Sequence, residues 1–208
     1  MTNVTRARRQ ARLSRALGLP LTPKSVKYFE KRPYPPGEHG RARRRTESDY
    51  AVRLKEKQRL RAQYALREKQ LHRIYLDARK EAGLTGESMV ELLEMRLDAL
   101  VLRSGFARTI LQARQAVTHR HILVDGKIVD RPSYRVKVGQ TIQVKPRSQA
   151  VEGFQIAAEG GNSDVFATTP SYLSVELDQL KSKLVARPKR SEVPVTCEVQ
   201  MVVEYYAR

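Results

Sequence analysis

The chain has 208 residues, and its 40 Lys and Arg residues outnumber its 22 Asp and Glu residues to give a formal net charge of +18. Because so much charge of one sign repels itself, the composition indicates a polyanionic partner, for which nucleic acid is the usual candidate. The single cysteine, Cys197, excludes a disulfide framework and a multi-cysteine zinc site.

The sequence carries no targeting or membrane signal. No apolar stretch follows the basic residues 1–10, and no apolar run approaches the roughly 20 residues that span a bilayer. A protein of the reducing cytoplasm with no membrane partner is therefore expected. A basic protein bound at a membrane surface is the minor alternative.

The positive charge is concentrated toward the N-terminus. Residues 1–81 hold 23 Lys and Arg and 8 Asp and Glu, a net charge of +15. Residues 82–208 hold 17 and 14, a net charge of only +3. The first part is therefore predicted to be an electrostatic arm, and the second resembles an ordinary folded domain.

The N-terminal arm combines arginines with a proline-rich loop. Residues 6–15 contain five arginines, and a disordered basic tail is the alternative interpretation. Residues 31–40 include three prolines, which remove donors and fix φ, so this run is predicted to be an extended loop. The loop is followed by four arginines that a rigid backbone would present to phosphate at low entropic cost: Arg41, Arg43, Arg44 and Arg45.

Residues 48–82 contain no Gly or Pro and are rich in good helix formers. They are predicted to form one long helix or two shorter ones, ending with Gly83 at the C′ position. Cations outnumber anions here more than solubility requires, which favours RNA contact over a merely solvated face. The apolar stripe comprises Leu54, Leu60, Tyr64, Leu71, Ile74 and Ala78.

Residues 88–144 predict a compact unit of two helices and a small antiparallel sheet. Capping boxes at Ser88-x-x-Glu91 and Thr109-x-x-Gln112 would open the helices, with a break at 103–106 between them. Asp125-Gly126 between β-rich runs predicts a type I′ hairpin. Further strands are expected at 134–138 and 141–144, from alternating apolar residues. The fold class is therefore α+β.

Several motifs in this unit resemble a known family. Residues 94–145 resemble the small RNA-binding module named after the small-subunit ribosomal protein S-four. The residues that carry the resemblance are Arg96-Leu97-Asp98, Gly105-Phe106-Ala107, Gln112-Ala113-Arg114-Gln115, Val117, His119, His121-Ile122 and Val124-Asp125-Gly126-Lys127. The module alone is not decisive, because pseudouridine synthases, a tRNA synthetase appendage and a heat-shock RNA binder also carry it.

Further stretches are similar to the ribosomal protein family itself, so that the resemblance covers the chain from about residue 29. They are Arg32-Pro33-Tyr34-Pro35-Pro36-Gly37 with His39-Gly40, Leu54-Lys55-Glu56-Lys57-Gln58, Glu68-Lys69-Gln70 and Val203-Glu204-Tyr205-Tyr206-Ala207-Arg208. Some family members bind zinc through N-terminal cysteines. This chain has no cysteine before Cys197, so we expect no metal and no cofactor.

The resemblance implies a structural constituent of the small ribosomal subunit, in the cytoplasm. It implies direct binding of small-subunit rRNA, a role early in assembly, contact with protein S-five, an influence on decoding accuracy and a place beside the channel through which mRNA enters. The expected organisation is a basic extended arm (1–45), a helical region (46–90), the RNA-binding module (91–153) and a C-terminal segment (154–208) that packs on the helical region and on a protein partner.

Three groups of site residues are expected. The four arginines at 41–45 are assigned to mRNA near its entrance. Glu176, Asp178, Gln200 and Glu204 are assigned to the contact with protein S-five. The rRNA contacts are assigned to Arg6, Arg8, Arg9, Arg12, Arg32, His39, Arg53, Lys57, Arg61, Lys69, Arg96, Arg103, Arg108, Arg114, Gln115, His119, Arg120, His121 and Lys127.

The C-terminal segment is expected to contact protein more than RNA. Residues 154–208 carry 6 Lys and Arg against 7 acids, so they cannot supply counterion release. Alternating Leu173, Val175 and Leu177 predict a half-buried strand, and 153–170 reads as a surface loop. The apolar residues of the last ten positions form either core or a partner interface, and both remain open.

Other function classes are disfavoured. His119 and His121 lie on one face of a strand without a third metal ligand nearby. No Ser, His and Asp spacing supports a nucleophile, and residues 83–88 lack the lysine of a phosphate-binding loop. An RNA-modifying enzyme would need a catalytic domain for which neither end of the chain is suited. No enzymatic activity and no small-molecule substrate are expected; a free regulatory RNA binder remains as the alternative.

Overall fold

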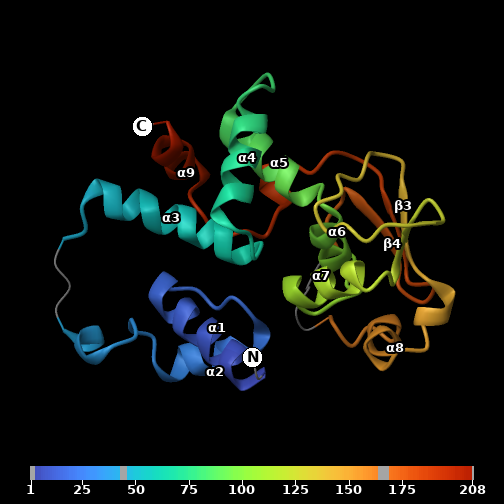
Figure 1. Cartoon of the computed structure of the whole chain (residues 1–208), viewed down its shortest axis with the longest axis horizontal. Helices are drawn as coiled ribbons and strands as arrows, with labels where there is room; N and C mark the ends of the chain where they lie inside the picture. Colours follow the sequence, from blue (N-terminus) through green and yellow to red (C-terminus); the bar gives the residue numbers. More distant parts are fainter. Residues whose placement is uncertain (1–2, 43–45, 164–168, 208) are drawn as a thin grey trace. The chain divides into compact units, whose positions relative to one another are not determined.

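The computed structural model describes residues 3–42, 46–163 and 169–207, with side chains from residue 9 onward (Figure 1). It groups the chain into two compact units. The first, which we call the helical unit, comprises Met1–His72 and Val195–Arg208, and the second, the central unit, comprises Arg73–Pro194. Helices and one antiparallel sheet confirm the predicted α+β class. The four-part organisation expected from composition stays a prediction.

The basic N-terminal segment is helical where an extended arm was expected. Helix α1 spans Asn3–Leu17 and helix α2 spans Pro23–Lys31. The expectation came from the concentration of positive charge in this segment, but Arg, Ala, Leu and Gln are good helix formers, and proline at the first position of α2 suits a helix start. Residues 18–22, between the two helices, and residues 32–37 form no helix or strand, and a 3-10 turn, η1, follows at Glu38–Arg41.

The long Gly-free and Pro-free segment forms two helices. Helix α3 spans Asp49–Gln63, capped by the Ser48 hydroxyl, which accepts from the Ala51 amide at 3.3 Å. Ala65 then has a φ of 49°, and α4 spans Glu68–Ala78. Because α4 ends at Ala78, Gly83 is not its C′ residue, and that prediction is wrong. Helix α9, Val199–Tyr206, packs against α3 in the helical unit.

In the central unit the first predicted helix is divided in two. Helix α5 spans Thr85–Glu94 and α6 spans Leu97–Arg103. The expected capping box is wrong, because α5 begins one turn earlier and Ser88 lies buried within it. The division falls at Arg96, whose backbone forms an isolated bridge with Arg135. Helix α7, Ile110–Thr118, confirms one half of its predicted capping box: the Thr109 hydroxyl accepts from the Gln112 amide at 3.2 Å. The Gln112 side chain accepts from the Arg108 amide at 2.9 Å instead of from Thr109.

The sheet has the strand order β2-β1-β3-β5-β4 and is antiparallel throughout. The strands are β1 Ile122–Val124, β2 Lys127–Ile128, β3 Thr141–Val144, β4 Leu173–Glu176 and β5 Lys181–Leu184. Asp125 and Gly126 have φ values of 48° and 76°, which confirms the predicted turn between β1 and β2.

Two expectations around the sheet are corrected. Residues 134–138 form no strand beyond the single bridge at Arg135, in which the Val136 amide donates to the Met95 carbonyl at 2.9 Å and the Leu97 amide donates to the Tyr134 carbonyl at 2.8 Å. The segment read as a surface loop contains helix α8, Glu152–Ala158, which buries Phe154 and Ala157. The buried apolar residues of α8 stabilise this helix despite the loop-forming residues that follow it. Short 3-10 turns lie at η2 Pro146–Ser148 and η3 Arg190–Glu192.

Candidate RNA-binding surface

Two of the predicted RNA contacts lie beside one buried carboxylate in the central unit. Arg96 is only 5% exposed and donates to both oxygens of Asp98, at 3.0 and 2.8 Å. Arg114, reaching from α7, donates to Oδ2 of the same carboxylate at 2.8 Å from Nη2. Asp98 is fully buried, so the pair of arginines compensates a charge that would otherwise be costly to bury.

A second buried carboxylate holds Arg103. Glu94, at the end of α5, is fully buried and accepts from Nη2 of Arg103 at 2.8 Å. The Tyr172 hydroxyl, just before β4, donates to the same carboxylate at 3.0 Å. Burial raises the pKa of Tyr172 and the charge of Glu94 raises it further, so this hydroxyl stays protonated as a donor. The network joins α5, α6 and the start of β4.

The exposed polar residues of the module gather mainly around α7 and the β1–β2 hairpin. Arg108 precedes α7, Gln115 lies on it, and Lys127 lies in the hairpin; all three side chains are exposed. Arg120 follows α7 with a φ of 63°, a left-handed conformation that a residue with a Cβ seldom adopts, and pairs with Asp130 at 3.2 Å.

The two histidines flank Arg120. Their rings lie 6.0 Å apart. His119 is exposed, whereas His121 is half-buried: its Nδ1 lies 2.9 Å from the Ser148 hydroxyl and its ring packs edge-on against Phe154. His119 is therefore placed to meet a ligand, and His121 chiefly supports the junction between α7 and β1.

In the helical unit, three predicted contacts on α3 are engaged in ion pairs. Arg53 donates to Glu204 at 2.8 Å, and Arg61 lies 3.7 Å from Glu68. Lys57 is buried, pairs with Glu68 at 3.0 Å and lies 4.3 Å from the Tyr205 ring centroid. These pairs hold α9 and the start of α4 on α3.

Glu68 and the C-terminal helix are linked by one further contact. The Tyr206 hydroxyl donates to Glu68 at 2.6 Å. Burial opposes ionisation of Glu68, but the hydrogen bonds from Tyr206 and Lys57 lower its pKa overall. Val199 and Val202 of α9 are buried, so part of the C-terminal tail contributes to the core of the helical unit.

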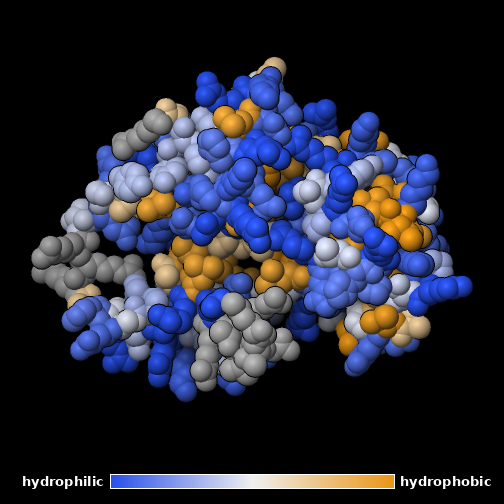
Figure 2. Space-filling model, viewed as in Figure 1, coloured by the Kyte–Doolittle hydropathy of each residue, from blue (hydrophilic) through white to orange (hydrophobic). Residues whose placement is uncertain are grey.

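The remaining predicted residues of the helical unit present their side chains to solvent, except for those outside the described region. Nothing is placed for the side chains of Arg6 and Arg8, or for Arg43, Arg44 and Arg45, which lie outside the described residues. Arg41 donates to the Tyr34 hydroxyl at 3.1 Å, which lowers the pKa of Tyr34. The exposed residues are Arg9, Arg12, Arg32, His39, Arg41 and Lys69. Figure 2 shows a mainly hydrophilic surface with separate hydrophobic patches.

The residues expected to meet a protein partner divide between the units. Glu176 and Asp178 are exposed in the central unit, and Gln200 is exposed in the helical unit. Glu204 is already paired with Arg53. Within the described ranges, no group of three His, Cys, Asp or Glu residues is arranged to hold a metal. No helix among them is long and apolar enough to cross a membrane.

Comparison with known proteins accounts for most of the chain. Residues 6–94 match the model of the ribosomal protein S4/S9 N-terminal domain, and residues 95–142 match that of the S4 domain. The chain is 76% identical over 208 residues to small ribosomal subunit protein uS4 of Beutenbergia cavernae, covering 100% of both chains. The chain belongs to the uS4 family.

Other members show the same full-length likeness. The protein of this name in Clavibacter michiganensis is 68% identical over 207 residues, which is 100% of this chain and 99% of that protein. That of Tropheryma whipplei is 66% identical over 198 residues, 95% and 97% of the two chains. Membership confirms the predicted family: a structural, RNA-binding protein of the small ribosomal subunit in the cytoplasm, and not an enzyme.

Sequence reasoning missed the partners of the arginines. Glu94, Asp98 and Tyr172 determine which cations are buried, yet none was a candidate. The spacing of Arg96 and Asp98 was one sequence feature that could have indicated this ion pair. An acidic residue two positions after an arginine at a helix start can accept a hydrogen bond from its guanidinium. The pairing of Glu94 with Arg103 joins two helices whose separation was not predicted.

Proposed function

We propose that this member of the uS4 family binds small-subunit rRNA through its exposed cations, and that its buried arginines hold those cations in place. The observation that carries this proposal is the division of the predicted contacts by burial. Arg108, Arg120 and Lys127 are exposed, whereas Arg96 and Arg103 form ion pairs with buried carboxylates. Phosphate contacts need donors that reach solvent, which favours the first set.

Replacing Arg108, Arg120 and Lys127 together with alanine tests this division. Each lost phosphate contact should lower the slope of log K against log salt by about 1, so affinity for small-subunit rRNA should fall about 10²-fold near 0.1 M salt. The circular dichroism spectrum should not change, because all three side chains are exposed.

The matched control removes equal charge elsewhere in the central unit. Arg187, Lys189 and Lys183 are exposed and are not among the proposed contacts. Their triple alanine variant should bind rRNA within a few-fold of the unchanged protein. If the two triple variants lose rRNA affinity equally, the assignment is contradicted, and binding depends only on non-specific charge.

We further propose that binding occurs early in subunit assembly and that the loop 32–45 lies beside incoming mRNA. The stacked contact supports a fixed loop: the Arg41 guanidinium lies 4.8 Å from the Tyr34 ring centroid. Alanine at Arg41, Arg43, Arg44 and Arg45 should slow translation of a structured message several-fold more than that of an unstructured one. Equal slowing of both would assign these arginines to rRNA alone.

The acidic C-terminal residues are proposed to meet protein S-five and so to influence decoding accuracy. The net charge of −1 over residues 154–208 supports a protein contact over an RNA contact. Exposed Glu176 and Asp178 carry this proposal better than Glu204, which is paired internally. Charge reversal of both to lysine should weaken co-purification with S-five and raise misreading, while rRNA affinity is retained. Unchanged co-purification would remove them from the interface.

A further inference from the structure

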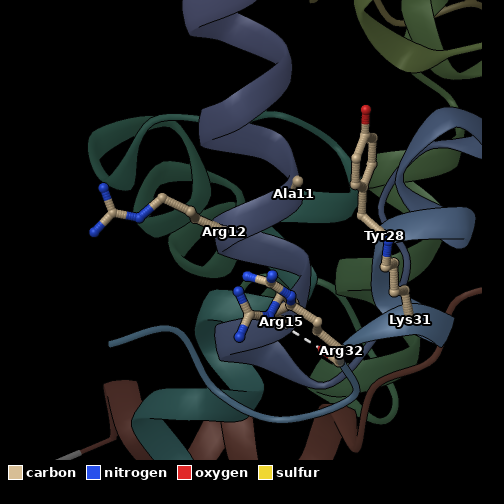
Figure 3. A pocket seen from close by; sticks show the side chains of 6 residues that line it. All are labelled: Ala11, Arg12, Arg15, Tyr28, Lys31 and Arg32. Carbon is tan, nitrogen blue, oxygen red and sulfur yellow. Dashed lines mark hydrogen bonds between the residues drawn. The ribbon is translucent and has the colours of Figure 1, made fainter. Parts of the chain in front are cut away.

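A small pocket lies between α1 and α2 in the helical unit. It is lined by Ala11, Arg12 and Arg15 of α1 and by Tyr28, Lys31 and Arg32 at the end of α2 (Figure 3). Its volume is about 320 Å³. That is near the lower end of the roughly 300–1,000 Å³ typical of small-ligand sites.

One of the lining arginines fixes the walls of the pocket. Arg15 Nε donates to the Arg32 carbonyl at 3.1 Å and to the Tyr34 carbonyl at 3.0 Å, and its Nη2 donates to the Pro35 carbonyl at 3.3 Å. Its guanidinium also lies 4.9 Å from the Tyr34 ring centroid. The chain after α2 is thereby held on α1, so a ligand would meet a preformed site at low ordering cost.

The other lining side chains offer one aromatic ring and three cations. Tyr28 is 53% exposed, and Arg12, Lys31 and Arg32 are exposed as well, although the Arg12 guanidinium points away from the Tyr28 ring (Figure 3). Among the residues with described side chains, no acidic residue lines the pocket, and Ala11 leaves space opposite the ring (Figure 3). A ligand matching this lining is flat, apolar on its faces and joined to an anion. A nucleotide has this chemistry, and base stacking on tyrosine is the common mode for unpaired RNA.

We propose that this pocket receives one unpaired nucleotide of the bound RNA, with its base against Tyr28 and its phosphates near Lys31 and Arg32. A base inside a duplex cannot enter, so the site selects a bulge, loop or junction. The inference rests on the proposed binding of small-subunit rRNA and adds stacking of a base on Tyr28 to the phosphate contacts. It makes Tyr28 a residue that determines specificity.

The test measures the affinity of the full chain for small-subunit rRNA over a range of salt concentrations. Tyr28→Ala should weaken binding about 5- to 100-fold, the range for loss of one stacked base. Because stacking neutralises no phosphate, the salt slope should not change. Tyr28→Phe keeps the ring and should bind within about twofold of the unchanged protein. Ala11→Leu fills the pocket without altering charge and should reproduce the loss seen in Tyr28→Ala.

Lys27→Ala is the matched control, because Lys27 is exposed on α2 and does not line the pocket. If Lys27→Ala changes binding, it should do so by lowering the salt slope. It should not show the salt-independent loss of affinity expected of Tyr28→Ala. If Tyr28→Ala and Tyr28→Phe both bind like the unchanged protein while its salt dependence stays steep, the pocket takes no nucleotide and the rRNA proposal stands. If the unchanged protein itself shows no rRNA binding, the proposed function fails instead.

Discussion

Replacing Arg103 with alanine is expected to lower the free energy of unfolding by about 3–5 kcal/mol, the usual cost of leaving a buried charge unpaired. Glu94 is fully buried and would lose the hydrogen bonds from Arg103, while it keeps the one from the Tyr172 hydroxyl. Urea unfolding followed by circular dichroism measures the change. Binding of rRNA should then fail only under conditions in which the central unit unfolds.

Arg108→Ala is the control for this prediction. The residue lies five positions further on, has the same charge and is exposed. Its loss should change stability by no more than about 0.5 kcal/mol, as is usual for surface positions, while weakening rRNA binding. A double change of Glu94 and Arg103 to leucine should recover much of the stability, because both charges leave together. If the Arg103→Ala protein is stable but binds rRNA weakly, the prediction is contradicted and Arg103 contacts RNA directly.

The sequence predicted the central unit well where local signals agree. The cap at Thr109, the break at Gly105 and the Asp125-Gly126 turn each depend on a few adjacent residues, and each is found. Ser88-x-x-Glu91 has the same local pattern, but packing favours a helix that starts at Thr85, so that Ser88 is buried. A capping motif shows only that a residue is able to cap a helix. Tertiary contacts determine whether the helix begins at that residue.

The N-terminal region shows a different limit. Its charge density favoured an extended arm, yet α1 forms because Leu17, Leu19 and Ser14 are buried within the helical unit. The Ser14 hydroxyl also accepts from the Leu21 amide at 3.2 Å, which holds the turn after the helix. Composition alone does not reveal such contacts between segments.

The division of arginines into buried and exposed sets could not be predicted from type and spacing. Arg103 and Arg108 look equivalent in the sequence, and only the position of Glu94 separates them. Arg120 differs from these two residues because its position in the sequence is itself informative. It follows α7 at the position where glycine is usual, and its φ is 63°.

The central claim is that phosphate contacts by exposed cations hold the protein on its RNA. Seven of the Arg and Lys residues assigned to rRNA have exposed side chains within the described part of the chain: Arg9, Arg12, Arg32, Lys69, Arg108, Arg120 and Lys127. With about six to ten phosphates neutralised, affinity should fall roughly 10³- to 10⁵-fold between 50 and 200 mM salt. This is the largest effect expected of any change considered, and it needs no substitution.

The measurement is the dissociation constant of the full chain with small-subunit rRNA at a series of monovalent salt concentrations. We expect log K to fall linearly with log salt, by about 0.7–0.9 for each contact, with a total slope of magnitude about 5 or more. The variant lacking Arg108, Arg120 and Lys127 should give a slope smaller by about 3. A nearly flat dependence, or a variant slope equal to that of the unchanged protein, would contradict the account.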